Sequence, residues 1–149
     1  MNMKSFNKTI VILSVIMNAM FWGCAEADKE FVHDSNAITK LACRASHEST
    51  AFEGVIIEYD KSGNPVLKAD FEQKDIDGGY GIIDIEIPER YSKEIDLENV
   101  YLYATLSWDQ SITPSLSGKH NIAGEGIVVT VKSGVGTKRN YRIRGYYEE

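Results

Sequence analysis

The sequence is patterned for short β-strands. In residues 80–87, YGIIDIEI, three isoleucines at every second position alternate with two acidic residues. Successive side chains of a strand point to opposite faces, so this segment has one apolar face and one charged face. Residues 97–107, LENVYLYATLS, repeat the alternation, with Tyr101 and Tyr103 on the face opposite Val100 and Leu102. Both segments are therefore predicted to be half-buried strands.

Further short apolar runs are separated by turn-forming residues. They span residues 38–44, 55–59, 66–71, 127–131 and 138–146. No stretch after residue 30 has the spacing of a long amphipathic helix, and only residues 91–99 could hold a helical turn. Short strands with Gly-containing turns between them are typical of two packed sheets. We therefore predict an all-β fold, an immunoglobulin-like antiparallel β-sandwich of about seven strands, over residues 37–149.

The first 24 residues have the order of an export signal. Lys4 and Lys8 are followed by an apolar run that ends at Trp22, then by Gly23 and Cys24. The run is shorter than the roughly 20 apolar residues that span a bilayer. This order resembles a bacterial lipoprotein signal, in which a peptidase cuts before the cysteine. The resemblance implies that residues 1–23 are a signal peptide. It also implies that Cys24 carries a diacylglycerol on its sulfur and a fatty acid such as palmitate on its amine.

Two alternatives remain for this segment: an ordinary secretory signal with Cys24 incidental, and a permanent transmembrane anchor. Lipidation is preferred, because two or three acyl chains supply the multiple signals that stable anchoring needs. Residues 24–36 would then be a lipidated N-terminus and polar linker. The acidic stretch after Cys24, AEADKE, resembles the signal by which Bacteroidota export lipoproteins to the outer face of the outer membrane; otherwise it is a solvated tether. We expect a lipid-anchored, surface-exposed protein of the outer membrane.

The charge of the chain limits its partners. Removal of residues 1–23 takes away two lysines and no acid, which leaves 14 basic residues against 22 acidic ones. An acidic domain of this kind argues against a nucleic-acid partner and against electrostatic docking on anionic lipid. With Cys24 lipidated, Cys43 has no intramolecular disulfide partner. We expect Cys43 to pack as a small apolar residue.

The second half of the chain resembles a known family. The segments IIDIEIP, IDLENVYLYATLSW, ITPSLSG, IVVTV and YRI occur in that order between residues 82 and 143. Their succession is similar to the immunoglobulin-like modules of Bacteroidota surface lipoproteins, close to the domain-of-unknown-function family numbered 5018. The resemblance covers about residues 36 to 146. It implies the fold and the compartment, and it implies no catalytic residues.

No arrangement of residues predicts catalysis, a metal site or a cofactor. Ser46, His47 and Glu48 are adjacent, whereas the side chains of a catalytic triad converge from distant segments. A polar loop is the better interpretation of this stretch. The three histidines at positions 33, 47 and 120 are far apart, and a zinc site needs three or four converging ligands. We therefore expect a protein that is not an enzyme.

Exposed aromatic residues give the one binding hypothesis. Tyr101 and Tyr103 share the predicted solvent face, and Trp108 follows the end of the same strand. A row of flat rings can stack on sugar rings, although exposed tyrosines can also simply pair across strands. Arg142 and Arg144, with Tyr146, form a second row whose cations could stack on the tyrosines.

We predict a non-enzymatic surface module that binds or presents a ligand, for which a glycan or a surface-protein partner is the leading class. The alternative is a structural, adhesin or filament-type subunit that assembles through β-strand contacts.

Replacement of the lipid acceptor tests the anchor. Cys24→Ser is expected to release the mature protein from the membrane or to leave the precursor unprocessed, because only a thiol can accept the diacylglycerol. Detergent phase partitioning and the apparent mass of the product measure this. A serine variant that stays in the detergent phase at mature size would contradict the lipoprotein interpretation.

Overall fold

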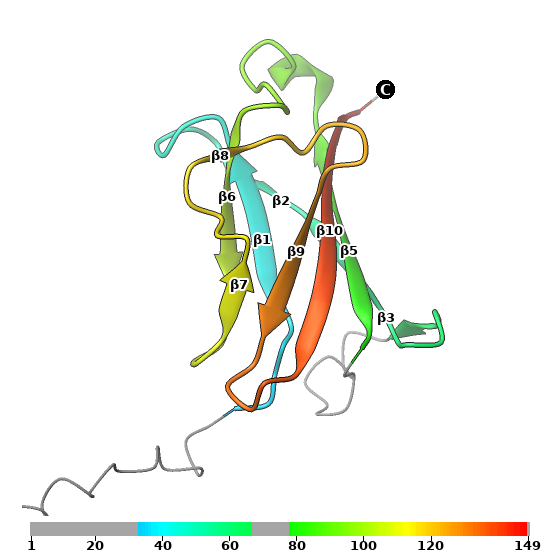
Figure 1. Cartoon of the computed structure of the whole chain (residues 1–149). Helices are drawn as coiled ribbons and strands as arrows, with labels where there is room; N and C mark the ends of the chain where they lie inside the picture. The colour runs from blue at the N-terminus through cyan, green and yellow to red at the C-terminus, as the bar shows by residue number, and fades with distance from the viewer. Residues whose placement is uncertain (1–32, 67–77, 149) are drawn as a thin grey trace, which may run out of the picture. The chain divides into compact units, whose positions relative to one another are not determined.

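The computed structural model describes residues 33–66 and 78–148, which form two β-sheets (Figure 1). Sheet A has four strands in the order β2-β1-β6-β8, and sheet B has six in the order β4-β3-β5-β10-β9-β7. The strands of sheet A are β1 (Lys40–Arg44), β2 (Phe52–Glu53), β6 (Val100–Thr105) and β8 (Lys119–His120). Those of sheet B are β3 (Val55–Tyr59), β4 (Pro65–Val66), β5 (Tyr80–Ile87), β7 (Ser111–Thr113), β9 (Ile127–Lys132) and β10 (Lys138–Tyr147). The predicted all-β sandwich is confirmed.

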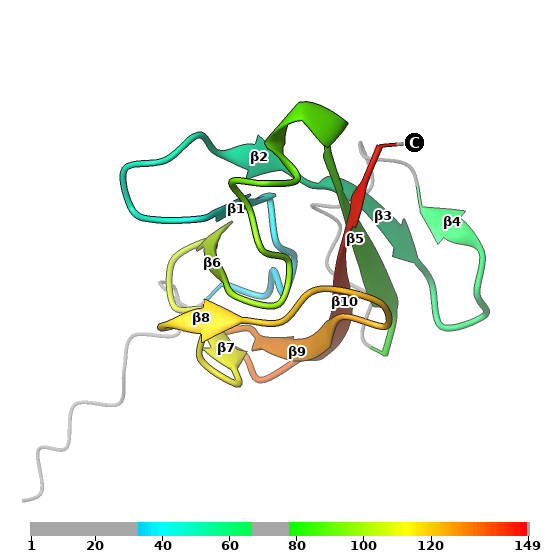
Figure 2. The same cartoon turned by 90° about the horizontal axis from the view of Figure 1, so that it is seen from above.

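The pairing is antiparallel except at the centre of sheet B, where β5 and β10 run parallel from Tyr80↔Asn140 to Ile87↔Tyr147. Figure 2 shows the two sheets from one end, with β5 and β10 in the middle of the larger one. The described residues form more strands than the predicted seven, because four of the elements are only two or three residues long. Within residues 33–66 and 78–148, the one helical element is a 3-10 turn at Glu89–Tyr91, which overlaps the segment expected to hold a helical turn, residues 91–99, only at Tyr91.

β3 and β4, which begin two neighbouring apolar runs of the sequence, pair as a hairpin. Tyr59 pairs with Pro65 and Glu58 with Val66 across a turn at residues 60–64. The Asp60 side chain accepts hydrogen bonds from the N–H groups of Ser62 and Asn64. Residues 67–71, which were expected to extend this strand, lie outside the described residues.

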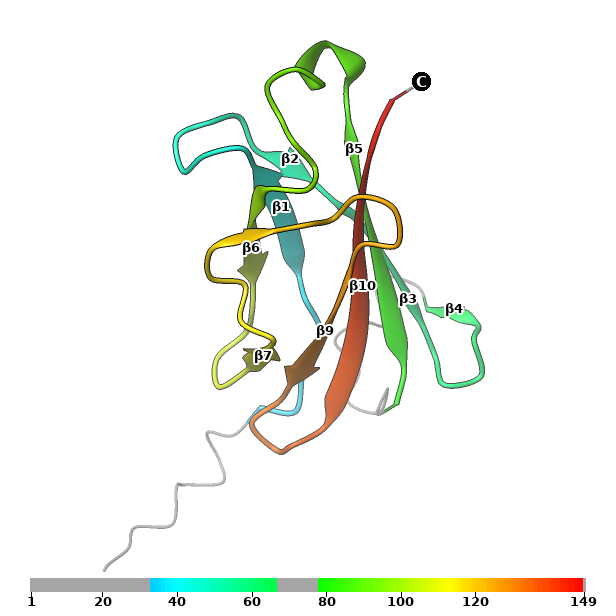
Figure 3. The ribbon, with the colours of Figure 1, turned by 45° about the horizontal axis from the view of Figure 1, so that its top comes forward.

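The two sheets face each other (Figure 3), and the side chains on the inward faces of the long strands form one core. The three alternating isoleucines of β5 and Val100 of β6 have no exposed surface, and Leu102 is nearly as buried. Cys43 is fully buried as well, as expected for a small apolar residue. The alternation in the sequence therefore identified the inward faces of β5 and β6 correctly.

The register of β3 runs against its own hydrophobicity. Val55 is 65% exposed, whereas Glu58 lies in the core with 1% exposure. The Glu58 carboxylate forms an ion pair with the buried Arg139 guanidinium of β10. Its other oxygen accepts a 2.5 Å hydrogen bond from the Tyr141 hydroxyl, which in turn accepts one from the Ile38 N–H. Burial raises the pKa of Tyr141 to about 12, and it lowers the pKa of Arg139. This network ties β3, β10 and the segment before β1 together.

Gly81 makes this network sterically feasible. It lies between Glu58 and Tyr141 in the same cross-strand row of sheet B. A Cβ atom at this position would overlap the Tyr141 ring. Because Gly81 has no side chain, the Tyr141 ring can cross β5 and reach the Glu58 carboxylate on β3.

Gly81→Ala is therefore expected to destabilise the domain by about 3 kcal/mol, because the ring must leave its hydrogen bonds or the strands must separate. Gly118→Ala is the matched control, since its Cβ would meet nothing within 4 Å and only its φ of +87° opposes the change. That variant should cost about 1–2 kcal/mol. Urea unfolding measures both, and equal losses would argue against the packing role of Gly81.

The buried thiol predicts a loss of stability in alkali. Burial raises the pKa of Cys43 from 9.0 to about 11. The unfolded chain then releases the proton first, so the contribution is complete below pH 9 and is lost as the pH rises to about 11. The loss should be about 2–3 kcal/mol. The unfolding free energy of Cys43→Ala should depend less on pH over this range than that of the parent protein. Parallel profiles for the two proteins would disprove this origin of the pH dependence.

Candidate functional site

The outer face of sheet A carries an aromatic patch, formed by Tyr101, Tyr103 and His47. The two tyrosines project from β6 on the side opposite the buried Val100 and Leu102, as period-two geometry requires. Tyr103 is 40% exposed and Tyr101 is partly exposed. The imidazole of His47 packs against both, at centroid distances of 4.3 Å from Tyr101 and 6.2 Å from Tyr103. Three rings thus lie together on one surface.

The loop that follows β1 brings His47 to this surface. The Arg44 Nη1 atom donates hydrogen bonds to the carbonyl oxygens of His47 and Ser49 at 3.2 and 2.9 Å. The Ser46 N–H and the Ser49 hydroxyl close the same turn. The His47 Nδ1 atom lies 2.6 Å from the Tyr103 hydroxyl, a hydrogen bond in which either partner can be the donor. The loop is therefore held in a shape that presents the ring.

Two cations flank the aromatic patch. The Arg44 guanidinium lies 5.7 Å from the Tyr103 ring centroid, and the Lys119 ammonium lies 5.7 Å from that of Tyr101. Both residues stand directly opposite Tyr101 on the neighbouring strands β1 and β8. The order across the sheet is thus cation, aromatic rings, cation. Such contacts are individually weak at exposed sites, about 0.5–1 kcal/mol.

The cations are not neutralised by close carboxylates. Among the described residues, no acidic side chain lies within ion-pair distance of Arg44 or Lys119. The Asp96 carboxyl group is the one that Lys119 influences. The pKa of Asp96 lies below the usual value, chiefly because the Asn99 side chain and the Glu98 N–H donate hydrogen bonds to it, and to a smaller extent because the Lys119 ammonium is near. The patch is therefore a basic and aromatic surface on an acidic protein. Chemically, it can stack on a flat apolar ring and bind an anion beside it.

The structure separates the other sequence-predicted aromatic and basic residues from this patch. Trp108 follows the opposite end of β6 from Tyr101, and within the described chain no ring contact includes it. Arg142 and Arg144, with Tyr146, lie on the outer face of the other sheet, where Arg144 makes a bidentate pair with Asp84 at 2.8 Å. The suggestion that their cations stack on Tyr101 and Tyr103 is wrong. The cations over those rings are Lys119 and Arg44.

His47 is the binding candidate that sequence reasoning missed. His47 was predicted to lie in a polar loop, and the structure places it in one. Its position in the sequence, far from β6, gave no indication that it would contact Tyr103. The register of β1 against β6, which pairs Arg44 with Tyr101, creates the contact. A sequence signal for it would have required knowledge of that pairing.

Within residues 33–66 and 78–148, no three side chains of His, Cys, Asp or Glu are grouped so that they could hold a metal ion. The same part of the chain holds no helix that is long and apolar enough to cross a membrane. Cys24, the predicted lipid attachment site, lies outside the described residues, so its lipidation stays a prediction.

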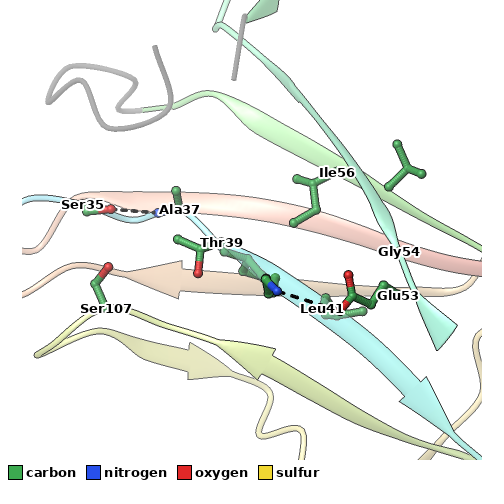
Figure 4. Close-up of a pocket in the computed structure, with 11 residues that line it drawn as sticks. Ser35, Ala37, Thr39, Leu41, Glu53, Gly54, Ile56 and Ser107 are labelled. Carbon is green, nitrogen blue, oxygen red and sulfur yellow. Dashed lines mark hydrogen bonds and ion pairs between the residues drawn. The ribbon is translucent and has the colours of Figure 1, made fainter. Parts of the chain in front are cut away.

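A cavity of about 670 Å³ opens between the start of β1 and the start of β3 (Figure 4). Backbone and apolar side chains line most of it, including Ala37, Leu41 and Ile56. Two charged residues also line the cavity, Lys40 and Glu53. The Lys40 Nζ atom lies 3.9 Å from the Glu53 Oε1 atom, and both side chains are largely exposed. The chemistry of the cavity suits an apolar chain or a strand better than a polar small molecule.

Comparisons with known proteins add little to this geometry. No family model matches the chain, and no curated protein matches it. A crystal structure described as a "putative secreted protein" from Bacteroides fragilis is similar, with 14% identity and a TM-score of 0.45. The match covers 78% of this chain and 98% of that chain. A likeness of this size supports no conclusion about location or activity.

Proposed function

We propose that this protein is a lipid-anchored surface module of the outer membrane that binds a carboxylate-bearing glycan on the outer face of sheet A. The observation that carries the ligand class is the flanking of the aromatic patch by Arg44 and Lys119. The anchor is supported by the order of residues that ends at Cys24. The protein acts in this proposal by binding, without chemistry.

Each part of the patch has a physical task in binding a sugar. The Tyr101 and Tyr103 rings offer apolar faces for the C–H side of a pyranose, and their hydroxyls reach ligand oxygens. The ammonium of Lys119 and the guanidinium of Arg44 would attract the carboxylate of a uronic or sialic acid. The chain as a whole is acidic and therefore repels an acidic ligand. The two cations reverse the charge locally, so they give an acidic ligand a specific place to bind.

Binding to matched acidic and esterified polysaccharides tests this proposal. We expect the mature chain to bind at least one of polygalacturonate, alginate and hyaluronan, and to lose most of that affinity when the carboxylates are methyl-esterified. Tyr101→Ala and Lys119→Met should each weaken binding about tenfold, which corresponds to about 1.4 kcal/mol. Tyr146→Ala is the control, because Tyr146 is 46% exposed on the other sheet. No binding to any of the three polymers, or equal loss in the control, would contradict the proposal.

A structural subunit is the second candidate, and the edge of sheet B favours it. Within the described residues, β4 covers only Glu58 and Tyr59 on the free side of β3. The other end of β3 exposes Val55 and Ile57, and Val55 also lines the cavity described above. A strand of another chain could pair there. Light scattering discriminates the two candidates, since a subunit should oligomerise, ignore acidic polymers and become monomeric in Val55→Lys.

A further inference from the structure

Two exposed apolar side chains lie at the end of the domain where the described chain begins, near His33. They belong to two loops at this end: residues 106–110 between β6 and β7, and residues 133–137 between β9 and β10. Each presents one large apolar side chain, Trp108 with 84% exposure and Val135 with 54%. Trp108 is the most exposed of all large hydrophobic side chains in the described residues. We name this surface, defined by His33, Trp108 and Val135, the tether end.

Hydrogen bonds fix both loops to the first described residues. The His33 N–H donates to the Asp109 carboxylate at 2.7 Å, and the Val135 N–H donates to the His33 carbonyl at 3.4 Å. One residue further, Gln110 Nε2 donates to the Ser35 carbonyl at 2.5 Å while its Oε1 atom accepts from the Ser107 N–H at 2.8 Å. Trp108 is thus exposed on a loop that is anchored on both sides. Its indole is presented to the surroundings by a defined structure.

The length of the preceding chain brings this surface close to the lipid. Eight residues lie between Cys24 and His33, and such a segment spans at most about 30 Å even when fully extended. With Cys24 acylated, the tether end is the part of the domain that stays within about 30 Å of the bilayer. Tryptophan favours the membrane–water interface, where its apolar body and its N–H group are both satisfied. Because the chain as a whole is acidic, it gains little from charge at an anionic surface, and an apolar contact suits it better.

We infer that the tether end rests on the bilayer, with Trp108 and Val135 inserted among the lipid headgroups, and that this contact orients the domain. The inference rests on the anchor of the proposed function. In this orientation β6 runs toward the membrane, since Thr105, its last residue, is at the tether end and Tyr101 lies four residues, about 13 Å, before it. The aromatic patch and Arg44 are held toward the medium.

The fluorescence of one residue tests this directly. Trp22 lies in the predicted signal peptide, so Trp108 is the single tryptophan of the mature chain. The lipidated chain is reconstituted into phosphatidylcholine vesicles with bromine on the lipids near the headgroup. We expect a shift of the Trp108 emission to shorter wavelength, quenching by the brominated lipid and protection from acrylamide. The soluble Cys24→Ser chain should show none of these effects with the same vesicles.

Two variants and flotation make the outcome decisive. Val135→Ser should reduce the quenching, whereas Val55→Ser, which alters an apolar residue of 65% exposure on β3, should leave it unchanged. A chain that floats with the vesicles while Trp108 stays accessible to acrylamide overturns the orientation and leaves the anchor standing. A chain that does not float overturns both. Equal effects of the two valine substitutions also overturn the inference, because the contact would not be confined to the tether end.

Discussion

The buried ion pair between Glu58 and Arg139 is the constraint around which sheet B is arranged. Taking two charges out of water costs several kcal/mol each, and their attraction offsets this only with close geometry and further hydrogen bonds. The Tyr141 hydroxyl supplies one of these bonds, and it is itself bound by the Ile38 N–H. The pair therefore contributes little net stability, but loss of one partner would leave a buried charge. Because any other register of β3 would leave a buried charge without its partner, the pair favours a single register of β3 in sheet B. The ion pair therefore contributes to the specificity of the fold more than to its stability.

That register explains which parts of the fold the sequence could predict. In β5 and β6 the apolar residues occupy one side of a strict alternation, so hydrophobicity and burial agree and the inward faces follow directly. In β3 three apolar residues, Val55, Ile57 and Tyr59, share one face, and hydrophobicity alone would turn that face inward. The structure turns it outward, because Glu58 must meet Arg139 and Tyr141. A partner 81 residues away in sequence decides the orientation, and no local pattern contains it. The parallel pairing of β5 with β10 could not be predicted either, because the paired residues are about 60 positions apart and no local pattern links them.

The candidate site divides in the same way. Exposure of Tyr101 and Tyr103 follows from period-two geometry within one strand, and it could be read from the sequence. The rest of the surface depends on pairing between strands: Arg44 from β1, Lys119 from β8 and His47 from the loop after β1. Trp108 is three residues beyond β6, close to the tyrosines in sequence, yet the strand carries it to the other end of the sheet. Proximity in sequence therefore suggested the wrong neighbour for the tyrosines and gave no sign of the right ones.

Under the proposed function, this division of β6 into two ends has a consequence. A surface lipoprotein must keep its binding face clear of the bilayer to which it is attached, and a flexible tether alone would let the domain tumble against the lipid. A strand whose start carries the aromatic patch and whose end leads to an exposed tryptophan couples the two requirements through one rigid element. Contact of Trp108 and Val135 with the headgroups would restrict the orientations of the domain, and it would thereby raise the fraction of time that Tyr101 and Lys119 face the medium. A ligand that binds the patch needs no change in the domain, only access, and access is what an oriented sheet A provides.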